Sequence, residues 1–382
     1  MAWHRCKHKR AIKNYNAQRV YSKNISAQGS AGSYFTNALS AFLLGIKILV
    51  NWLAFLVCLV IESIKLLPGW IINLFYFCPF KKNSIPSHVY NIGHRGAAAY
   101  EVENTIPACE FALTKYNANA IEIDISFTAD KEVVLWHDWD PDNFVSIIRQ
   151  IGLEPGVKYR PLAPENKMRK HTHNLTLEEL RKHYGYALRK SGKVEAVIPT
   201  LDQFLKWAVS KDSLKMVILD VKIPQEKPEF VAPMLTSISE LIETYQPEFK
   251  VILMSPYSTI IDEMKKTAAR ANYTLDIELP AGIVLDPPAY SAVDKAVGMK
   301  NHFASAGRPT ILQLGPWTTY RRLIKYDLTR IEKLKDTAEQ IETYISWTID
   351  KKREMRCLLK MGVNAILTNR PDSLAKIYKK LK

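Results

Sequence analysis

Short apolar runs rich in β-branched residues alternate with longer amphipathic runs from residue 88 to the end of the chain. The first kind of run predicts strands, and the second kind, with apolar residues every three or four positions, predicts helices. Alternation of this kind over about 295 residues is typical of a parallel sheet, and eight strands predict a closed barrel. We therefore expect an α/β fold, a TIM (β/α)8 barrel, over residues 88–382.

The individual elements follow from the same pattern. Strands are expected at 89–93, 120–126, 132–136, 216–221, 250–255, 343–349 and 364–368, with one more near 275–285 or 310–314. Helices are expected at 106–115, 175–183, 201–210, 230–244, 258–271 and 351–361. Residues 138–174 are too long for an ordinary connection and form a candidate substrate lid over the active face.

Ahead of the barrel lies a strongly apolar segment. Residues 38–61 would span about 36 Å as a helix, which is enough to cross a bilayer core of roughly 30 Å. A second apolar block, 66–80, is broken by Pro68 and Gly69. Residues 38–80 therefore predict a transmembrane or membrane-hairpin segment, and two buried helices are the alternative. A single span would place the barrel in a lumen, whereas a hairpin would return it to the cytosol.

The positive charge is concentrated at this end of the chain. The protein has a formal net charge of +15, but residues 1–82 hold eleven Lys and Arg against one acid, which leaves only +5 (15 − 10) for the rest. A basic flank beside an apolar segment favours anionic membrane lipids as a partner, and no nucleic-acid motif accompanies the charge. Residues 1–37 are expected to be a flexible basic N-terminus, with an organelle transit peptide as the alternative.

Charged side chains gather where the expected strands end. These residues are His94, Arg95, Glu122, Asp124, His137, Asp220 and Lys222. Because the carboxyl ends of barrel strands meet at one face, we expect these side chains to form one site. Two histidines, three carboxylates and two cations suit metal-assisted cleavage of a phosphate ester. The five cysteines show no metal-ligand spacing, and they do not indicate a disulfide framework.

The three carboxylates are the expected metal ligands. Glu122 and Asp124 lie two positions apart on one strand, so they project to the same side, and Asp220 from another strand can complete the set. Carboxylate oxygens suit a hard divalent cation, Mg²⁺ or Ca²⁺, that neutralises the phosphodiester. The alternative is that Glu122 and Asp124 lie on a strand face in contact with solvent.

The two strand-end histidines are the expected acid and base, because imidazole titrates near neutrality. One of His94 and His137 would deprotonate water or the substrate's adjacent hydroxyl, and the other would protonate the leaving alkoxide. The assignment between the two stays open, and two structural histidines are the alternative. His171 and His173 lie in a basic loop and are expected to be solvated.

The remaining candidates surround this centre. Arg95 would bind the phosphate with its bidentate guanidinium or form an ion pair with Glu103. Lys222 would donate to a phosphate oxygen or orient Asp220. Glu103 is expected to support the metal ligands from outside, and the alternatives are a fourth, weaker metal ligand or a cap for the helix near Ile106. Trp347 is a further candidate for the pocket wall.

In chain order, His94-Arg95-Gly96 with Glu103-Asn104-Thr105, Glu122-Ile123-Asp124, His137-Asp138 and Asp220-Val221-Lys222 resemble the motifs of the glycerophosphodiester phosphodiesterase family. The resemblance covers roughly residues 90–372. It implies a TIM barrel that hydrolyses phosphodiesters with a divalent cation, bound by residues corresponding to Glu122, Asp124 and Asp220. Many members have Glu at the position of Asp220, so the metal position is expected to differ slightly.

The expected activity is therefore hydrolysis of glycerophosphodiesters to glycerol 3-phosphate and an alcohol. The resemblance leaves a lysophospholipase D open, with a lysophospholipid substrate and a lysophosphatidic acid product. A sphingomyelinase D-like enzyme that forms a cyclic phosphate would share the same site. A catalytically silent membrane scaffold is the alternative from another class of protein. The predicted localisation is at a membrane.

Overall fold

The computed structural model describes residues 85–190, 192–271, 291–307 and 317–382 of the chain. In these ranges no helix combines the length and the apolar character needed to cross a bilayer. The predicted basic N-terminus, 1–37, and the predicted membrane segment, 38–80, lie outside the described residues, as do the alternative sites for a strand at 275–285 and 310–314.

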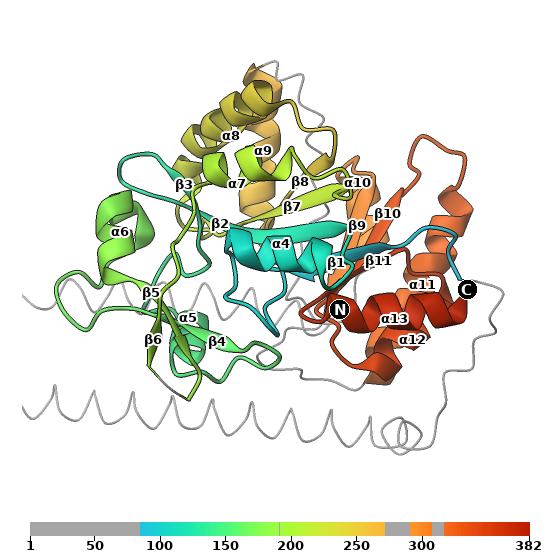
Figure 1. Ribbon diagram of the computed structural model, residues 1–382. Coiled ribbons are helices and arrows are strands. Elements are labelled where there is room, and N and C mark those ends of the chain that lie inside the picture. Colours follow the sequence, from blue (N-terminus) through green and yellow to red (C-terminus); the bar gives the residue numbers. More distant parts are fainter. Residues whose placement is uncertain (1–84, 191, 272–290, 308–316) are drawn as a thin grey trace, which may run out of the picture. The chain divides into compact units, whose positions relative to one another are not determined.

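A curved parallel sheet forms the centre of the fold (Figure 1). Its strands lie in the order β8-β7-β2-β1-β11-β10-β9, and every neighbouring pair on this path is parallel. The strands are β1 (Tyr90–His94), β2 (Ala120–Phe127), β7 (Met216–Val221), β8 (Lys250–Met254), β9 (Phe303–Gly307), β10 (Thr343–Trp347) and β11 (Ala365–Thr368). The described strands thus form the sheet of a barrel-like α/β fold, as the alternating pattern predicts.

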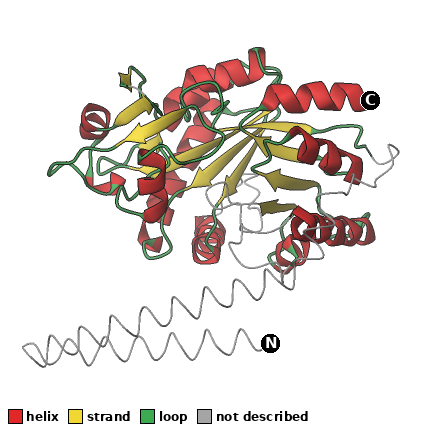
Figure 2. Ribbon diagram, turned by 90° about the horizontal axis from the view of Figure 1, so that it is seen from below, coloured by secondary structure: helices red, strands yellow, loops and turns green. Residues whose placement is uncertain are grey.

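Helices lie around the outer side of this sheet (Figure 2). They are α4 (Ile106–Thr114), α7 (Leu201–Ala208), α8 (Val231–Tyr245), α9 (Ser258–Ala271), α10 (Ala292–Gly298), α11 (Trp317–Leu334), α12 (Lys352–Met361) and α13 (Pro371–Leu381). Outward strand residues such as Ile121 and Ile123 are buried in one cluster with helix residues such as Leu113 and Phe204. Burial of these apolar faces supplies most of the driving force for the fold.

The opposite side of the same strands forms a second core on the inner side of the curved sheet. Its members alternate with the outward residues and come from every strand of the path: Ile92, Ala120, Met216, Ile218, Ile252, Met254, Phe303, Ile345, Ala365 and Leu367. Because side chains alternate along a strand, the next inward positions on β1, β2 and β7 are His94, Glu122 and Asp220. The apolar cluster therefore forms the floor beneath the charged residues.

Between β2 and β7 the chain forms an insert. It contains β3 (Val133–Leu135), α5 (Phe144–Gln150), η2 (Thr172–Asn174), α6 (Leu177–His183) and an antiparallel sheet of β4 (Tyr159–Leu162), β5 (Gly185–Leu188) and β6 (Lys193–Val194). A short helix, η3 (Pro228–Phe230), follows β7. Trp136, Tyr184 and Tyr186 lie at the centre of the insert's own apolar cluster.

The structure differs from the sequence-based elements in several places, and α10, α11, α13, β5 and β6 were not predicted. Residues 132–136 are not a barrel strand, because β3 pairs antiparallel with β2 at its carboxyl end. Residues 138–174 hold α5, β4 and η2, so this candidate lid is not an irregular loop. The strand Phe303–Gly307 was not predicted, because its Ala, Ser and Gly residues have little β propensity.

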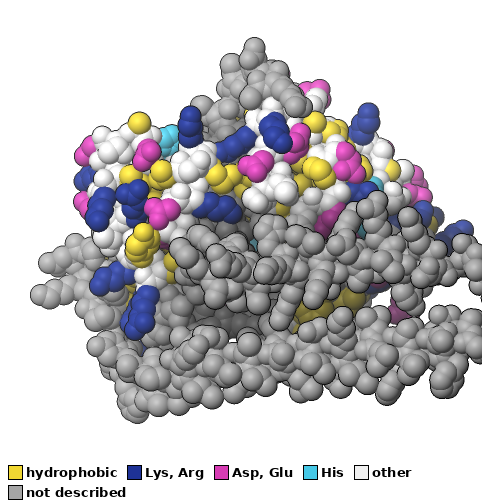
Figure 3. All heavy atoms as spheres, turned by 180° about the vertical axis from the view of Figure 1, so that it is seen from behind, with side chains coloured by type: hydrophobic (Ala, Val, Ile, Leu, Met, Phe, Trp, Pro, Cys, Tyr) yellow, Lys and Arg dark blue, Asp and Glu magenta, His cyan; other side chains and the backbone are white. Residues whose placement is uncertain are grey.

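Charges of both signs are mixed on the described part of the face shown in Figure 3. In Figure 3, Lys and Arg side chains are interspersed with Asp and Glu side chains and with apolar ones on the described part of that face. This mixture agrees with the small formal excess of charge after residue 82 and with an ordinary globular surface.

Candidate functional site: three buried carboxylates between two oriented histidines

The carboxylates predicted to bind metal lie together on the inward side of β2 and β7. Asp124 pairs directly with Asp220 across these two parallel strands, and Glu122 precedes Asp124 by two positions. One carboxylate oxygen from each of the three residues lies within 4.8 Å of the others. Glu122 and Asp124 are almost completely buried, and Asp220 is 8% exposed at the edge of the cluster.

Buried carboxylates so close together are poorly stabilised as anions. Burial and the neighbouring carboxylates raise the pKa of Glu122, and burial also raises the pKa of Asp220. Burial alone would raise the pKa of Asp124 too, but the nearby Arg95 and Lys222 outweigh it and hold that pKa well below its ordinary value. The cluster would therefore gain from additional positive charge.

The oxygen atoms themselves fit a divalent cation. Glu122 Oε1 and Asp220 Oδ1 are buried without a hydrogen-bond donor among the described residues. Buried acceptors are normally satisfied, so two unsatisfied oxygens on adjacent strands indicate that a further partner belongs there. An all-oxygen set of carboxylates is the donor set that Mg²⁺ and Ca²⁺ prefer. The residues present thus fit the predicted metal.

Lys222 lies at the edge of the same cluster. Its Nζ is 2.6 Å from Asp220 Oδ2 and 2.9 Å from Asp124 Oδ1. Burial would lower the pKa of Lys222, but these two carboxylates outweigh it and raise that pKa, so the side chain remains a cation. The structure therefore shows Lys222 against Asp220, as one sequence interpretation expected, and its contact with a phosphate stays a prediction.

The turn after β1 directs Arg95 inward. Gly93 and Gly96 permit this turn, since a Cβ at Gly93 would collide with the carbonyl of Gly96, and Gly96 has a φ of +85°. The Arg95 backbone N–H donates to Glu122 Oε2 at 2.9 Å. The guanidinium Nε of Arg95 lies 2.8 Å from Asp124 Oδ2.

The other end of the Arg95 guanidinium is also engaged. Nη1 donates to Glu103 Oε2 at 2.8 Å and to Glu154 Oε2 at 3.1 Å. The ion pair with Glu103 is therefore present in the structure, and the predicted phosphate contact of Arg95 remains a prediction. Glu103 supports Arg95 and does not cap the following helix, because Thr105 is the N-cap of α4.

One histidine is oriented by an adjacent carboxylate. His137 follows β3, which pairs antiparallel with β2 through Leu135 and Ile125. Because β3 runs back along β2, His137 lies beside the part of β2 that holds the carboxylates. Its Nδ1 lies 2.7 Å from Asp138 Oδ1. An ionised carboxylate only accepts hydrogen bonds, so Nδ1–H donates and Nε2 is left for proton transfer. Burial, Arg149 and Lys222 lower the pKa of His137, which keeps the ring neutral.

The other histidine is oriented by an amide. His94 Nδ1 lies 2.7 Å from Asn369 Oδ1, just after β11. Asn369 Nδ2 donates to Asp350 Oδ2 at 2.8 Å, and the Asn369 backbone N–H donates to Asp350 Oδ1 at 2.9 Å. The amide nitrogen is thus committed to Asp350, so the amide oxygen must accept from His94.

His94 consequently presents Nε2 to the metal cluster, 3.8 Å from Glu122 Oε2. Burial and the adjacent Arg95 lower the pKa of His94 to about 4. Both predicted acid–base histidines therefore have Nδ1 fixed by a partner and are held in the neutral form.

A buried ion-pair cluster supports this site from the side of the insert. Arg149 of α5 contacts the carboxylates of Asp138 and Glu103, and its Nε lies 2.8 Å from Glu154 Oε2. Arg149 is 1% exposed. This cluster connects the partner of His137 with the partners of Arg95, so it fixes the insert against the barrel.

Three other candidates lie apart from the centre or at its edge. His171 is half exposed near Asp140, and the His173 ring stacks on Trp139. Neither histidine contacts the three carboxylates in any ion pair or hydrogen bond that the described residues make. The Trp347 ring packs against Gly307, where a Cβ would collide with the indole, so Trp347 lies on the inward side of β10.

Several supporting residues escaped the sequence interpretation. Asn104 Nδ2 donates to Asp124 Oδ2 at 2.8 Å, and the Asp124 N–H donates to Asn104 Oδ1 at 3.0 Å, which fixes one metal-ligand candidate. Asn369 and Asp350 follow the last two strands, so the strand-end signal that identified the other residues applies to them as well. Arg149 and Glu154 gave no such signal, because they lie within the expected loop.

Comparisons with known proteins identify relatives of this chain. A family model described as "Glycerophosphoryl diester phosphodiesterase family" matches residues 94–373. A glycerophosphodiester phosphodiesterase of Caldanaerobacter subterraneus subsp. tengcongensis is 26% identical over 290 residues, covering 76% of this chain and 97% of that protein. The human lysophospholipase D GDPD1 is 23% identical over 293 residues, covering 74% of this chain and 84% of that protein.

A solved structure extends the comparison to the fold. The phosphodiesterase of Oleispira antarctica, in complex with the product sn-glycerol-3-phosphate, superposes with a TM-score of 0.53 at 14% identity. The match covers 78% of this chain and 98% of that chain. At this identity the likeness shows a shared fold.

Proposed function

The chain belongs to the glycerophosphoryl diester phosphodiesterase family, and from this premise we propose that it hydrolyses glycerophosphodiesters to glycerol 3-phosphate and an alcohol. The observation that carries the proposal is the set of buried carboxylate oxygens beside two neutral histidines with fixed Nδ1 atoms. Glu122, Asp124 and Asp220 would hold one divalent cation, Mg²⁺ or Ca²⁺. When bound, this cation supplies positive charge to a phosphodiester oxygen.

The two histidines then perform the proton transfers. A neutral imidazole with Nδ1–H bound to a partner can accept a proton at Nε2, and the partner stabilises the resulting imidazolium. The Asp138 carboxylate does this for His137 more strongly than the Asn369 amide does for His94. We therefore assign His137 as the base that takes a proton from the attacking water. His94, once it has taken a proton from solvent, is the acid that gives this proton to the leaving alkoxide and returns to the neutral form.

The cations beside the carboxylates complete the proposal. Lys222 lies at the exposed edge of the cluster, where Asp220 is also partly accessible, so its ammonium is placed to contact a non-bridging phosphate oxygen. Arg95 is committed to three carboxylates and acts mainly by holding Asp124 and Glu122 in position.

A lysophospholipid is the second substrate candidate. The human relative is named a lysophospholipase D, and the apolar residues 38–61 would place this chain at a membrane, where lysophospholipids are concentrated. We propose that residues 38–80 anchor the protein to a membrane and that the basic flank contacts anionic lipid. On this substrate the same cleavage would release a lysophosphatidic acid.

The test is a comparison of substrates with one purified preparation of the full chain. Glycerophosphocholine, glycerophosphoinositol and lysophosphatidylcholine are offered in parallel, with products identified by mass and with His94→Ala as the control. Turnover of the water-soluble diesters, lost in His94→Ala, supports the main proposal. Turnover of the lysolipid alone moves the assignment to lysophospholipase D. A cyclic phosphate product contradicts hydrolysis by water, and no turnover by folded, metal-loaded protein contradicts the proposal.

A further inference from the structure

The helix α5 (Phe144–Gln150) has its polar and apolar sides reversed. Phe144, Ile147 and Ile151 follow one another at helical spacing, and their side chains are 63%, 41% and 58% exposed. The residues of this helix that are buried are Ser146 and Arg149. A helix on the surface of a water-soluble domain normally does the opposite and turns its apolar stripe to the core.

The reversed orientation is fixed by ion pairs. Arg149 binds Asp138, Glu103 and Glu154 from inside the protein, so α5 is attached through its charged side. The apolar side chains are therefore not needed to hold the helix, and another role must account for their exposure.

These exposed apolar residues are concentrated in one short segment. The described residues include nine exposed large hydrophobic side chains, and five of them lie within the ten positions 144–153. Val145 and Leu153 complete the set, which we call the α5 face: Phe144, Val145, Ile147, Ile151 and Leu153. Single exposed hydrophobic residues are normal on protein surfaces, but a concentration of this kind marks an interaction site.

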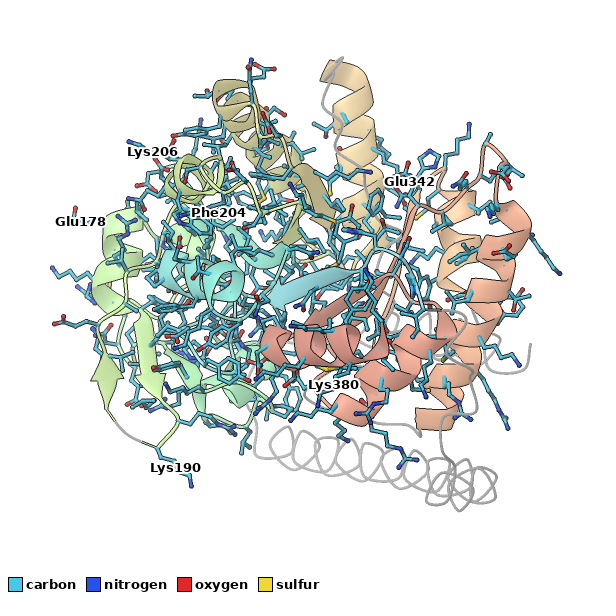
Figure 4. All side chains as sticks on the ribbon, turned by 45° about the vertical axis from the view of Figure 1, so that its right-hand side comes forward. Glu178, Lys190, Phe204, Lys206, Glu342 and Lys380 are labelled. Atoms are coloured by element: carbon cyan, nitrogen blue, oxygen red, sulfur yellow. The ribbon has the colours of Figure 1, made fainter. Side chains whose placement is uncertain are left out.

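Basic side chains frame the α5 face. Arg160 Nη1 donates to the carbonyl of Gln150 at 2.6 Å, and Arg189 Nε donates to the carbonyl of Gly152 at 2.7 Å. At the other end, Arg169 Nη2 donates to the carbonyl of Pro141 at 2.7 Å, but its Nε pairs with Asp142 at 2.6 Å, so the excess positive charge of the frame comes from the side of Arg160 and Arg189. Lys190, at the outer end of the hairpin that follows Arg189, points away from the protein (Figure 4).

An apolar centre within a frame of cations complements an anionic lipid surface. Apolar side chains enter the boundary between headgroups and acyl chains, while Arg and Lys contact the phosphates above it. We propose that the α5 face inserts into an anionic bilayer and is the membrane-contacting surface of the catalytic domain. A second copy of this chain fits less well, because two such faces would bring their arginines together.

The α5 face lies on the helix that supports the partner of His137. Arg149, on the buried side of the same helix, contacts Asp138, the residue that orients His137. The contact with lipid would therefore lie beside the catalytic histidine and bring the site to substrates within the membrane. The membrane contact itself does not depend on the proposed activity; only its consequence for lysophospholipids rests on the proposed function.

The decisive experiment reads the environment of one position in the full chain. An environment-sensitive fluorescent amino acid is encoded at Ile147, and a matched probe is encoded at Tyr326, which is 56% exposed on α11. Vesicles of phosphatidylcholine with phosphatidylserine are added, with or without brominated acyl chains. We expect a blue shift at position 147 and at least a twofold quenching by brominated lipid, with neither effect at position 326.

The opposite results overturn the proposal. Unquenched emission at position 147, in protein that sediments with the vesicles, would show that another part of the chain makes the contact. Emission at position 147 that is already blue-shifted without lipid and depends on protein concentration would assign the α5 face to a second copy.

An activity measurement separates this proposal from the proposed function. Ile147→Glu/Ile151→Glu is compared with Val209→Glu, a control at a position that is 40% exposed on α7's carboxyl end. We expect unchanged turnover of glycerophosphocholine and at least a tenfold lower kcat/KM for lysophosphatidylcholine in anionic vesicles. Equal turnover of both substrates by variant and control would contradict the inference. A wild-type protein without activity would contradict the proposed function and leave the fluorescence result to decide the membrane contact.

Discussion

Arg149→Met removes the positive charge at the centre of the buried ion-pair cluster. Methionine fills a similar length of the cavity, so the main change is electrostatic. The structure shows what is left behind: Glu103, Asp138 and Glu154 all contact Arg149, and all three are almost completely buried.

The expected loss of stability follows from this burial. Removal of one partner from a buried ion pair costs about 3–5 kcal/mol, because the remaining charge is neither hydrated nor paired. A change of 1 kcal/mol lowers Tm by about 2–4 °C in domains of roughly 150–250 residues. We therefore expect the Tm of Arg149→Met at neutral pH to fall by about 10 °C.

The loss should shrink as the pH falls. Burial raises the pKa of Asp138 to about 6 even with Arg149 present, although the guanidinium opposes this rise. A carboxyl group with a raised pKa binds more protons in the folded state than in the unfolded state. The free energy of unfolding therefore falls as the pH rises from about 4, the pKa of Asp138 in the unfolded chain, through about 6, its pKa in the folded protein. Without Arg149 this pKa rises further, so acid should restore part of the stability of the variant.

Thermal unfolding at several pH values measures both effects. Arg330→Met is the matched control, because the Arg330–Asp294 pair of 2.9 Å lies at the surface, with side chains 38% and 44% exposed. Such a pair contributes only about 0–1 kcal/mol. If Arg149→Met and Arg330→Met melt within about 2 °C of each other at neutral pH, the buried cluster does not have the energetic role argued here.

Three further substitutions test the orientation of the histidines. Asp138→Asn should lower kcat by roughly 10²–10⁴-fold in steady-state assays, because the neutral amide of the introduced Asn no longer stabilises protonated His137. A loss in kcat of less than threefold would contradict the assignment of His137 as the base. Asn369→Ala should lower kcat/KM by about 10- to 100-fold with little change in Tm, and an unchanged pH–rate profile together with unchanged kcat/KM would refute its positioning role. Gly156→Ala should impair turnover and lower Tm, because Gly156 has a φ of +85° and a Cβ there would lie 2.9 Å from Asn369 Nδ2. Gly192→Ala is the control, since a Cβ at Gly192 meets nothing within 4 Å. This control should match the wild type in both turnover and Tm.

The sequence predicted six of the seven described strands on the parallel path, and most of the described helices, because their patterns are regular. The helix predicted at 258–271 has those bounds in the structure, since its apolar residues face the core with helical spacing. The spacing of Glu122 and Asp124 likewise predicted one shared side, and the structure places both with Asp220. Their role as metal ligands stays a prediction, as does the assignment of the two histidines.

What the sequence could not predict depends on long-range contacts. Nothing near Arg149 along the chain indicates that Glu103 would lie against it, and α5 escapes the helical pattern because its buried side is polar. The antiparallel direction of β3 was also hidden, since a run of three apolar residues does not specify which way the strand pairs.

We propose that Glu122, Asp124 and Asp220 hold a divalent cation on which phosphodiester cleavage depends. The most direct measurement follows glycerophosphocholine by phosphorus NMR with the purified full chain, in magnesium, in calcium and in chelator, beside Glu122→Gln. We expect a glycerol 3-phosphate signal that requires the metal and is absent in Glu122→Gln, although this variant remains folded. Undiminished glycerol 3-phosphate in chelator, or wild-type turnover by Glu122→Gln, would contradict this proposal.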